Sequence, residues 1–180
     1  MAEVFRQAAP HPAFVTLPGS ELDRAWDRVY ADYSFAPSVR SESWPGFDEP
    51  ARSVTWSVAP IFEDFGRRFI DCEIEIATAL ASAATSLVGA EGTLLALDWQ
   101  HPGYRFAPGF ATPPTRESSW PIPVLPDGDY YLYIAYDFSF GWLTHPWEQS
   151  VCAFGDLLAL MSPSIDALRL PVLRRGGESV

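Results

Sequence analysis

The sequence predicts an α+β fold, a single domain with a mainly antiparallel sheet of about five or six strands and two helices packed on one face. Short runs of branched and aromatic residues, bounded by Gly, Pro, Asp and Ser, are typical of strands. Two longer stretches repeat apolar residues every three or four positions, as helices do. No repeat or linker divides the 180 residues. We therefore expect one domain over residues 19–180, preceded by a loosely ordered, proline-containing arm over residues 1–18.

The first predicted helix begins at Ser20. Ser20 and Asp23 resemble a capping box, in which side chains bond to the free amide groups at the start of a helix. From Leu22 to Tyr33 the apolar residues fall on one helical face, and Pro37 prevents continuation. This apolar stripe is expected to pack on the sheet.

The second predicted helix follows Pro60. Glu63 and Asp64 stand in its expected first turn, where negative charge interacts favourably with the helix dipole. From Phe62 to Leu87 the apolar residues step by threes and fours, and Gly89 ends the pattern. We expect this longer helix to be the main cover of the sheet.

A β-hairpin within residues 125–155 forms the centre of the predicted sheet. Residues 130–136 and 150–154 are its expected strands, and a long connection joins them. Strict alternation over residues 53–58 predicts a further strand with one buried face. Other strands are expected at residues 93–99, 104–106 and 167–173, and residues 156–161 fit either a short helix or a continued strand.

The segment between residues 107 and 125 is predicted to be an extended loop. Its five prolines lack the amide donors that a central strand requires. The loop could drape an edge of the sheet or act as a lid over a pocket, and draping is the simpler role.

Charge and composition exclude several classes of function. The formal net charge is -11, and the only close basic pairs are Arg67–Arg68 and Arg174–Arg175, so we expect no nucleic-acid surface. All 12 basic residues are Arg, and the chain has no Lys or Asn. A Lys Schiff base, a phosphate-loop Lys and an Asn oxyanion donor are thereby excluded. No apolar run reaches the roughly 18 residues of a membrane span, so no membrane association is expected.

The two cysteines indicate a reducing compartment. Cys72 and Cys152 both stand inside apolar segments, where a free thiol behaves as a small buried hydrophobe. The pattern of a secretory leader is not seen. We therefore expect a cytoplasmic protein, a monomer or small homo-oligomer, with both thiols free.

Two predicted strand ends carry a histidine beside a proline, a tryptophan and an acid. We expect these segments, residues 98–104 and 145–149, to be neighbours in space. A small hydrolase-type site could then be built from Asp98, His101, His145 and Glu148, with a carboxylate orienting a histidine as general base. The same residues could hold zinc or iron. Neither a paired-ligand motif such as H-E-x-x-H nor a nucleophile motif such as G-x-S-x-G is present, so we expect no metal and no other cofactor.

A binding function requires less of these residues. Aromatic side chains ringed by Asp98, Asp137 and Glu148 would suit a small cationic ligand or a protein partner with a basic face, unless most of the rings fill the core. The favoured hypothesis is thus a non-enzymatic binding or interaction module, by analogy with acidic immunity proteins and toxin antidotes that capture basic partners. The hydrolase-type enzyme is the alternative. The candidate surface comprises Asp98, Trp99, Gln100, His101, Tyr104, Trp142, His145, Trp147, Glu148 and Gln149.

Four segments, taken in order, resemble a bacterial protein family. DWQHPGYRF, LPDGDYY, DFSFG and HPWEQSVCAFG are similar to the domain of unknown function 2716, and the resemblance runs from about Glu21 to Arg175. It implies a bacterial protein. No established activity, ligand or catalytic residue comes with the family.

Overall fold

One antiparallel sheet of nine strands runs through the computed structural model, which describes residues 11–63 and 66–180. Every pair of neighbouring strands is antiparallel, as the sequence predicted, but the expected five or six strands are too few. In spatial order the strands are β1 (Phe14–Thr16), β4 (Tyr104–Phe106), β3 (Leu94–Asp98), β5 (Tyr131–Ile134), β6 (Gly141–His145), β7 (Ser150–Phe154), β2 (Ser53–Ser57), β8 (Val172–Arg175) and β9 (Glu178–Ser179).

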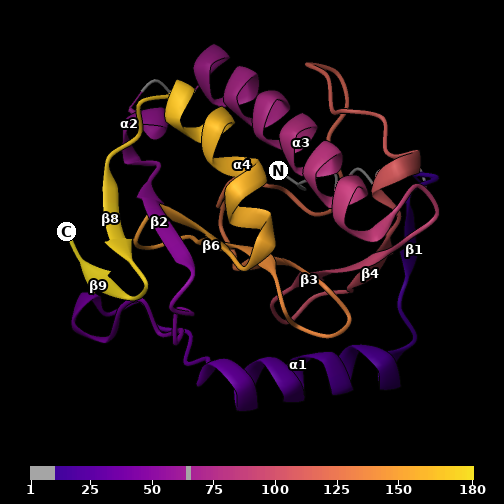
Figure 1. Cartoon of the computed structure of the whole chain (residues 1–180), viewed down its shortest axis with the longest axis horizontal. Coiled ribbons are helices and arrows are strands. Elements are labelled where there is room, and N and C mark those ends of the chain that lie inside the picture. The colour runs from indigo at the N-terminus through magenta and orange to yellow at the C-terminus, as the bar shows by residue number, and fades with distance from the viewer. Residues whose placement is uncertain (1–10, 64–65) are drawn as a thin grey trace, which may run out of the picture.

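Helices cover both faces of this sheet, so the prediction of two helices on one face is wrong (Figure 1). On one side lie α3 (Arg67–Val88) and α4 (Asp156–Ala167), and on the other lies α1 (Gly19–Tyr33). The central strands have apolar residues at successive positions, which alternate between the two faces. In β3, Leu94 and Ala96 join the core under α3, whereas Leu95 and Leu97 join the core over α1.

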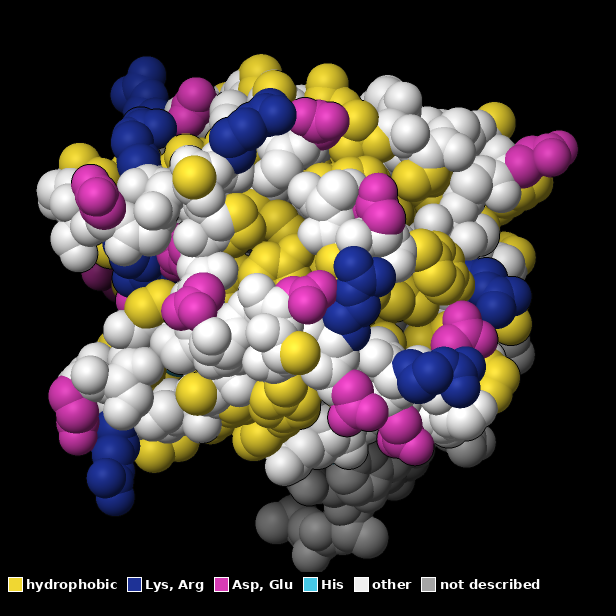
Figure 2. All heavy atoms as spheres, turned by 60° about the horizontal axis from the view of Figure 1, so that its bottom comes forward, with side chains coloured by type: hydrophobic (Ala, Val, Ile, Leu, Met, Phe, Trp, Pro, Cys, Tyr) yellow, Lys and Arg dark blue, Asp and Glu magenta, His cyan; other side chains and the backbone are white. Residues whose placement is uncertain are grey.

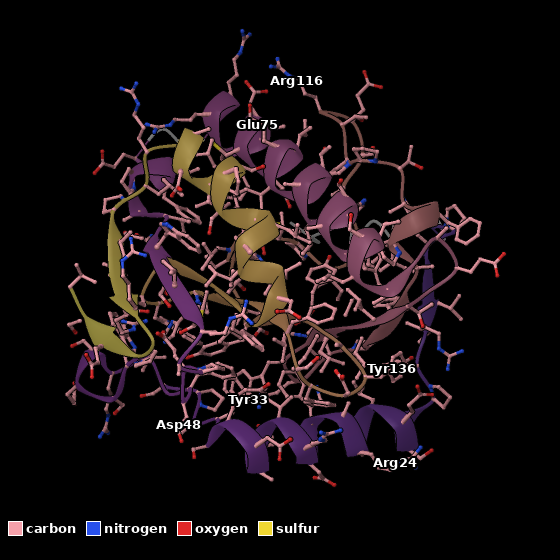
Figure 3. The ribbon with its side chains drawn as sticks, in the orientation of Figure 1. Arg24, Tyr33, Asp48, Glu75, Arg116 and Tyr136 are labelled. Carbon is pink, nitrogen blue, oxygen red and sulfur yellow. The ribbon has the colours of Figure 1, made fainter. Side chains whose placement is uncertain are left out.

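The first helix packs through Ala25, Val29 and Tyr33, which the predicted stripe includes. Figure 3 shows Tyr33 on the α1 side of the molecule and Glu75 on the opposite, α3 side. The Tyr33 hydroxyl donates to the Phe138 carbonyl at 2.5 Å and so ties the end of α1 to the β5–β6 turn. The expected capping box is not formed, because the helix begins at Gly19 after Pro18 and has no side-chain cap.

The second predicted helix is divided in two. A single turn, α2 (Ala59–Phe62), carries Pro60 near its start, and α3 begins only at Arg67. Glu63 therefore ends α2 and does not lie in the first turn of the long helix, while Asp64 lies outside the described residues. The apolar spacing of α3 was predicted correctly, since Phe69, Cys72, Ile76 and other members of that pattern are buried.

The predicted hairpin is a meander of three strands, because the expected connection contains β6. This strand lies between β5 and β7 and is buried along its whole length. Gly141 permits that close packing: a Cβ atom there would lie 2.6 Å from the Phe154 ring and 2.7 Å from the Tyr133 carbonyl oxygen. After β7, residues 156–167 form α4, so the alternative of a continued strand is excluded.

Strand β2 is buried on both faces, although its alternation predicted one. Val54 and Trp56 face the core under α3 and α4. Ser53 and Thr55 are also buried, and Thr55 donates to the carboxylate of Glu49 at 2.8 Å. Thr55 is thus covered by another polar side chain, an arrangement that a hydrophobic pattern does not report.

The proline-rich loop packs on one face of the sheet, and its Trp120 ring also contacts Phe14 of the edge strand β1. Trp120, Ile122 and Val124 are buried in the core on the α3 side. The Trp142 indole donates to the Val124 carbonyl at 2.9 Å, and the Tyr133 hydroxyl donates to the Ile122 carbonyl. The loop therefore completes the cover of this face beside α3.

Both edges of the sheet differ from expectation. Part of the expected arm forms β1, which pairs with β4, while residues 1–10 lie outside the described range. At the other edge the predicted strand 167–173 is displaced to β8, which follows Pro171 and pairs with β2 and β9. Within residues 11–63 and 66–180, no helix is long and apolar enough to cross a membrane.

Candidate functional site

Asp98, His101 and Asp129 meet at the end of the central strands β3 and β5 and are called the Asp–His cluster below. Asp98 ends β3, His101 lies in the turn between β3 and β4, and Asp129 precedes β5. Because β3 pairs with β5, with Asp98 opposite Tyr131, both acids lie at the same end of the two strands. The Nδ1 atom of His101 lies 3.1 Å from Oδ1 of Asp98 and 3.3 Å from Oδ2 of Asp129.

The surroundings raise the pKa of each of the three residues in the Asp–His cluster. Burial raises the pKa of Asp98 to about 6, and burial also raises the pKa of Asp129. The hydrogen bond between Nδ1 of His101 and Oδ1 of Asp98 raises the pKa of His101, because the carboxylate stabilises the charged imidazolium. Asp127 is a third acid nearby and accepts a hydrogen bond from the Tyr131 hydroxyl at 2.5 Å. Two carboxyl groups thus contact the imidazole, and Asp127 acts on those two acids.

Backbone contacts orient the three side chains. The amide of Tyr130 donates to Oδ1 of Asp129 at 2.7 Å, which leaves Oδ2 directed at His101. The amide of His101 donates to the Asp98 carbonyl at 3.2 Å and closes the turn. Gln100 adopts φ 66° in this turn, a left-handed conformation that is uncommon for a residue other than Gly.

A hollow of about 570 Å³ adjoins the cluster and lies between α1 and the turn after β3. His101 forms part of its wall, and the imidazole is 58% exposed. Trp26 also lines the hollow, and its buried indole N–H has no partner among the described residues. The remaining lining residues are Thr16, Leu17, Leu22, Asp23, Gln100 and Pro102.

The α1 side of the molecule carries charges of both signs. Figure 2 shows hydrophobic side chains gathered in its middle, with acidic and basic side chains interspersed around them. Any preference for positive charge must therefore come from a local group of acids, not from a uniformly acidic face.

The two segments predicted to be neighbours lie on either side of the Tyr130 ring. Trp99 and Trp147 each contact this ring, with centroids 5.9 Å and 5.5 Å away. Trp147 is 39% exposed, while Trp99 is half-buried and donates from its indole to the Tyr30 hydroxyl at 3.0 Å. A short aromatic row therefore runs beside the Asp–His cluster.

His145 is a buried residue with both ring nitrogens occupied. Its Nδ1 atom accepts from the amide of Glu148 at 3.1 Å, and its Nε2 atom lies 3.2 Å from the Tyr130 hydroxyl. Burial lowers the pKa of His145 to about 4, so the ring is neutral at pH 7. These contacts fix the connection between β6 and β7.

Glu148 belongs to a buried ion network with Glu49 and Arg174. The Arg174 guanidinium donates two hydrogen bonds to Glu148, at 2.6 and 2.7 Å, and one to Glu49 at 2.9 Å. Burial acts to raise the pKa of Glu148, but hydrogen bonds from Arg174 and Ser150 outweigh it and lower that pKa. The four residues of the hydrolase-type alternative therefore form two groups with different partners.

Three other members of the predicted surface lie elsewhere. Trp142 is fully buried in the core on the α3 side, and Tyr104 packs against Phe14 in the same layer. The Gln149 carbonyl accepts from the amide of Val58 at 2.7 Å. The predicted ring of acids is also broken, since Asp137 follows β5 at the end opposite Asp129.

Asp127 and Asp129 were not among the predicted site residues. In the sequence Asp127-Gly128-Asp129 they are typical turn formers, and nothing adjacent to them suggests a histidine partner. The pairing of β3 with β5 brings Asp129 to His101. The sequence feature that could have indicated a site here is the pair of acids around Gly128, directly before a predicted strand.

Comparison with protein families agrees with the resemblance noted in the sequence. The model of a family described as "Protein of unknown function (DUF2716)" matches residues 16–159. The chain belongs to this family. The DUF2716 match includes all three residues of the Asp–His cluster but ends before Arg174.

One relative of this DUF2716 chain is the uncharacterized protein YxiI of Bacillus subtilis (strain 168). The two are 40% identical over 84 residues, which are 47% of this chain and 52% of the relative. The match thus spans about half the length of the curated relative. No solved structure matches the chain.

Proposed function

We propose that this protein is a non-enzymatic binding module that recognises a cationic group at the Asp–His cluster. The observation that carries the proposal is the placement of two carboxylates, Asp98 and Asp129, against one exposed imidazole, with Asp127 close enough to raise the pKa of both acids. The cationic group would be an ammonium or guanidinium. It could belong to a Lys or Arg side chain of a protein partner or to a small ligand in the adjoining hollow.

The surroundings of the cluster support this role. A positive charge near aromatic faces gains cation–π attraction, roughly 0.5–1 kcal/mol at exposed sites. Trp99 and Trp147 supply such faces next to the acids. A cavity of a few hundred Å³ is a usual size for a ligand site, and the hollow beside His101 falls in that range.

The surroundings of His101 favour binding over the hydrolase-type alternative. A general base must be unprotonated in its resting state. Asp98 and Asp129 both contact Nδ1 of His101 and stabilise the charged imidazolium instead. The second histidine of that alternative, His145, has both nitrogens engaged in the fold.

Calorimetry with two defined probes tests the proposal. N-acetyl-arginine amide represents a free small ligand, and a short Arg-containing peptide represents a partner side chain. We expect saturable binding at low salt that Asp129→Asn weakens at least fivefold, because one of the acids facing the cation loses its charge. Asp166→Asn, an exposed site on α4, removes the same charge and should leave affinity unchanged.

Preference for one probe would identify the source of the cationic group. If Asp129→Asn and Asp166→Asn lose the same amount of affinity, binding depends only on net charge, and a specific site at the cluster is refuted. Failure of both probes to saturate would refute recognition of these groups.

A further inference from the structure

We infer that the Asp–His cluster binds a divalent transition-metal ion through Oδ1 of Asp98, Nδ1 of His101 and Oδ2 of Asp129. The inference rests on the proposed recognition of positive charge at this cluster and adds a second class of cation, a metal ion. It changes the sequence-based expectation of no metal, which considered Asp98 and His101 without Asp129.

The distances from the imidazole nitrogen to the two carboxylate oxygens already match the spacing of donor atoms around a metal ion. Metal–ligand bonds of about 2.0–2.2 Å, at octahedral or tetrahedral angles, separate neighbouring donor atoms by roughly 3.0–3.5 Å. In the cluster, His101 Nδ1 lies 3.1 Å from one carboxylate oxygen and 3.3 Å from the other, and all three atoms lie within 4.8 Å of one another. An ion that replaces the Nδ1 proton needs little rearrangement of these side chains.

The groups behind the ligands hold them in place. Metal-binding carboxylates are normally fixed by a hydrogen bond to their other oxygen. The Tyr130 amide makes this bond to Oδ1 of Asp129 and leaves Oδ2 as the ligand atom. Asp98 is fixed by its position in β3, where it pairs with Tyr131 of β5. The ligands therefore come from two segments that the sheet already joins.

The ligand set favours particular ions. One imidazole nitrogen with two carboxylate oxygens suits Mn²⁺, Co²⁺ or Zn²⁺, whereas Mg²⁺ and Ca²⁺ favour oxygen ligands alone. Three protein ligands leave coordination positions for water or for a ligand group in the adjoining hollow, since His101 lines that hollow. A partly exposed site with three protein ligands should exchange its ion readily.

Titration of the tag-free full chain with Zn²⁺ alone, followed by calorimetry, tests the inference. We expect one ion per chain, with affinity reduced at least tenfold by Asp129→Asn and by His101→Gln. His11→Gln and Asp166→Asn make the same chemical changes away from the cluster and should preserve binding. Mg²⁺ should bind at least tenfold more weakly than Zn²⁺. Zn²⁺ affinity that survives both cluster variants would overturn the assignment.

Two further measurements keep the test decisive. Asp98→Asn changes a ligand on another segment and replaces Asp129→Asn if that variant does not fold. The arginine probes separate the metal inference from the proposed function. If they bind in an Asp129-dependent way and Zn²⁺ does not bind, the metal inference fails and the proposed function stands. If neither binds, both fail, and if Zn²⁺ displaces the probes, both are supported.

Discussion

His101 and His145 lie at the same end of strands β3 and β6, which both pair with β5. Their surroundings shift their pKa values in opposite directions. Two carboxylates raise the pKa of His101. Burial lowers the pKa of His145 to about 4, because a charged imidazolium would lose its hydration there. Similar His-Pro sequences therefore produce an exposed imidazole with a raised pKa in one case and a buried imidazole with a lowered pKa in the other.

The lowered pKa of His145 predicts an acid-sensitive contribution to stability. The pKa of an unfolded histidine lies near the usual 6.5, whereas the pKa of the folded His145 is about 4. Between these values the unfolded chain binds the proton and the folded chain does not, so the free energy of unfolding falls as pH drops from 6.5 to 4. The contribution is about 2–3 kcal/mol at pH 7.

Urea unfolding at pH 7.5, 6 and 5 measures this contribution. His145→Gln should flatten the pH dependence in this window and, because hydrogen bonds are lost, lower stability at pH 7.5 by about 1–3 kcal/mol. His11→Gln is the matched control and should keep the slope. A variant at position 145 with an unchanged slope would show that another group titrates.

At the scale of elements, the sheet edge formed by β8 depends on one arginine. Arg174 pairs with Glu49 and Glu148, and its side chain is only 11% exposed. The Glu49 side chain is 2% exposed, and its second oxygen has no partner within the described part of the chain. The network therefore holds two carboxylates against one guanidinium and joins β8 to the segments before β2 and β7.

Removing the arginine should be costly. Arg174→Met leaves both carboxylates in a poorly hydrated place without a counter-charge, and breaking a buried pair in this way costs about 3–5 kcal/mol. Adding Glu49→Gln and Glu148→Gln to Arg174→Met should recover part of the loss, because the unpaired charges are then gone. Chemical denaturation of the single and triple variants measures both effects. A loss below about 1 kcal/mol in Arg174→Met would mean that the pairs behave as exposed ones.

Elements were predictable where their pattern is local. The helical spacing in α1 and α3, the alternation in β2 and the apolar run of β3 could be recognised from neighbouring residues. Strand β6 was missed because Gly141 begins it and a His-Pro step ends it, and because burial on both faces removes the alternation. The stripe on α1 indicated that it packs but not on which face of the sheet.

Two of the three residues in the Asp–His cluster could be predicted from the sequence, because only those two are close together in the chain. Asp98 and His101 are close in sequence, so their contact is local. Asp129 reaches them only because β3 pairs with β5, and strand order cannot be read from one sequence. Trp142 was assigned to the surface because an aromatic residue beside polar ones looks the same in a core strand and at an exposed edge.

At the scale of the whole molecule, one sheet separates two cores. The core between the sheet and α3 with α4 contains Cys72, and the core on the α1 side contains Cys152. Both thiols are free and buried. The reducing, cytoplasmic environment inferred from the sequence stays a prediction. Each cysteine nevertheless reports on one of the two cores.

The final prediction is that both cores open together. Burial raises the pKa of Cys152 to about 12 and also raises the pKa of Cys72, so neither native thiol should react quickly with a disulfide reagent at pH 8. The central strands supply side chains to both cores, so neither layer can separate without exposing apolar surface on β3, β5, β6 and β7. Thiol reactivity in urea, measured on Cys72→Ala and on Cys152→Ala, should therefore show the same midpoint relative to each variant's own unfolding curve. Earlier exposure of Cys152 would mean that α1 detaches while the α3 side stays folded, and would contradict a single cooperative unit.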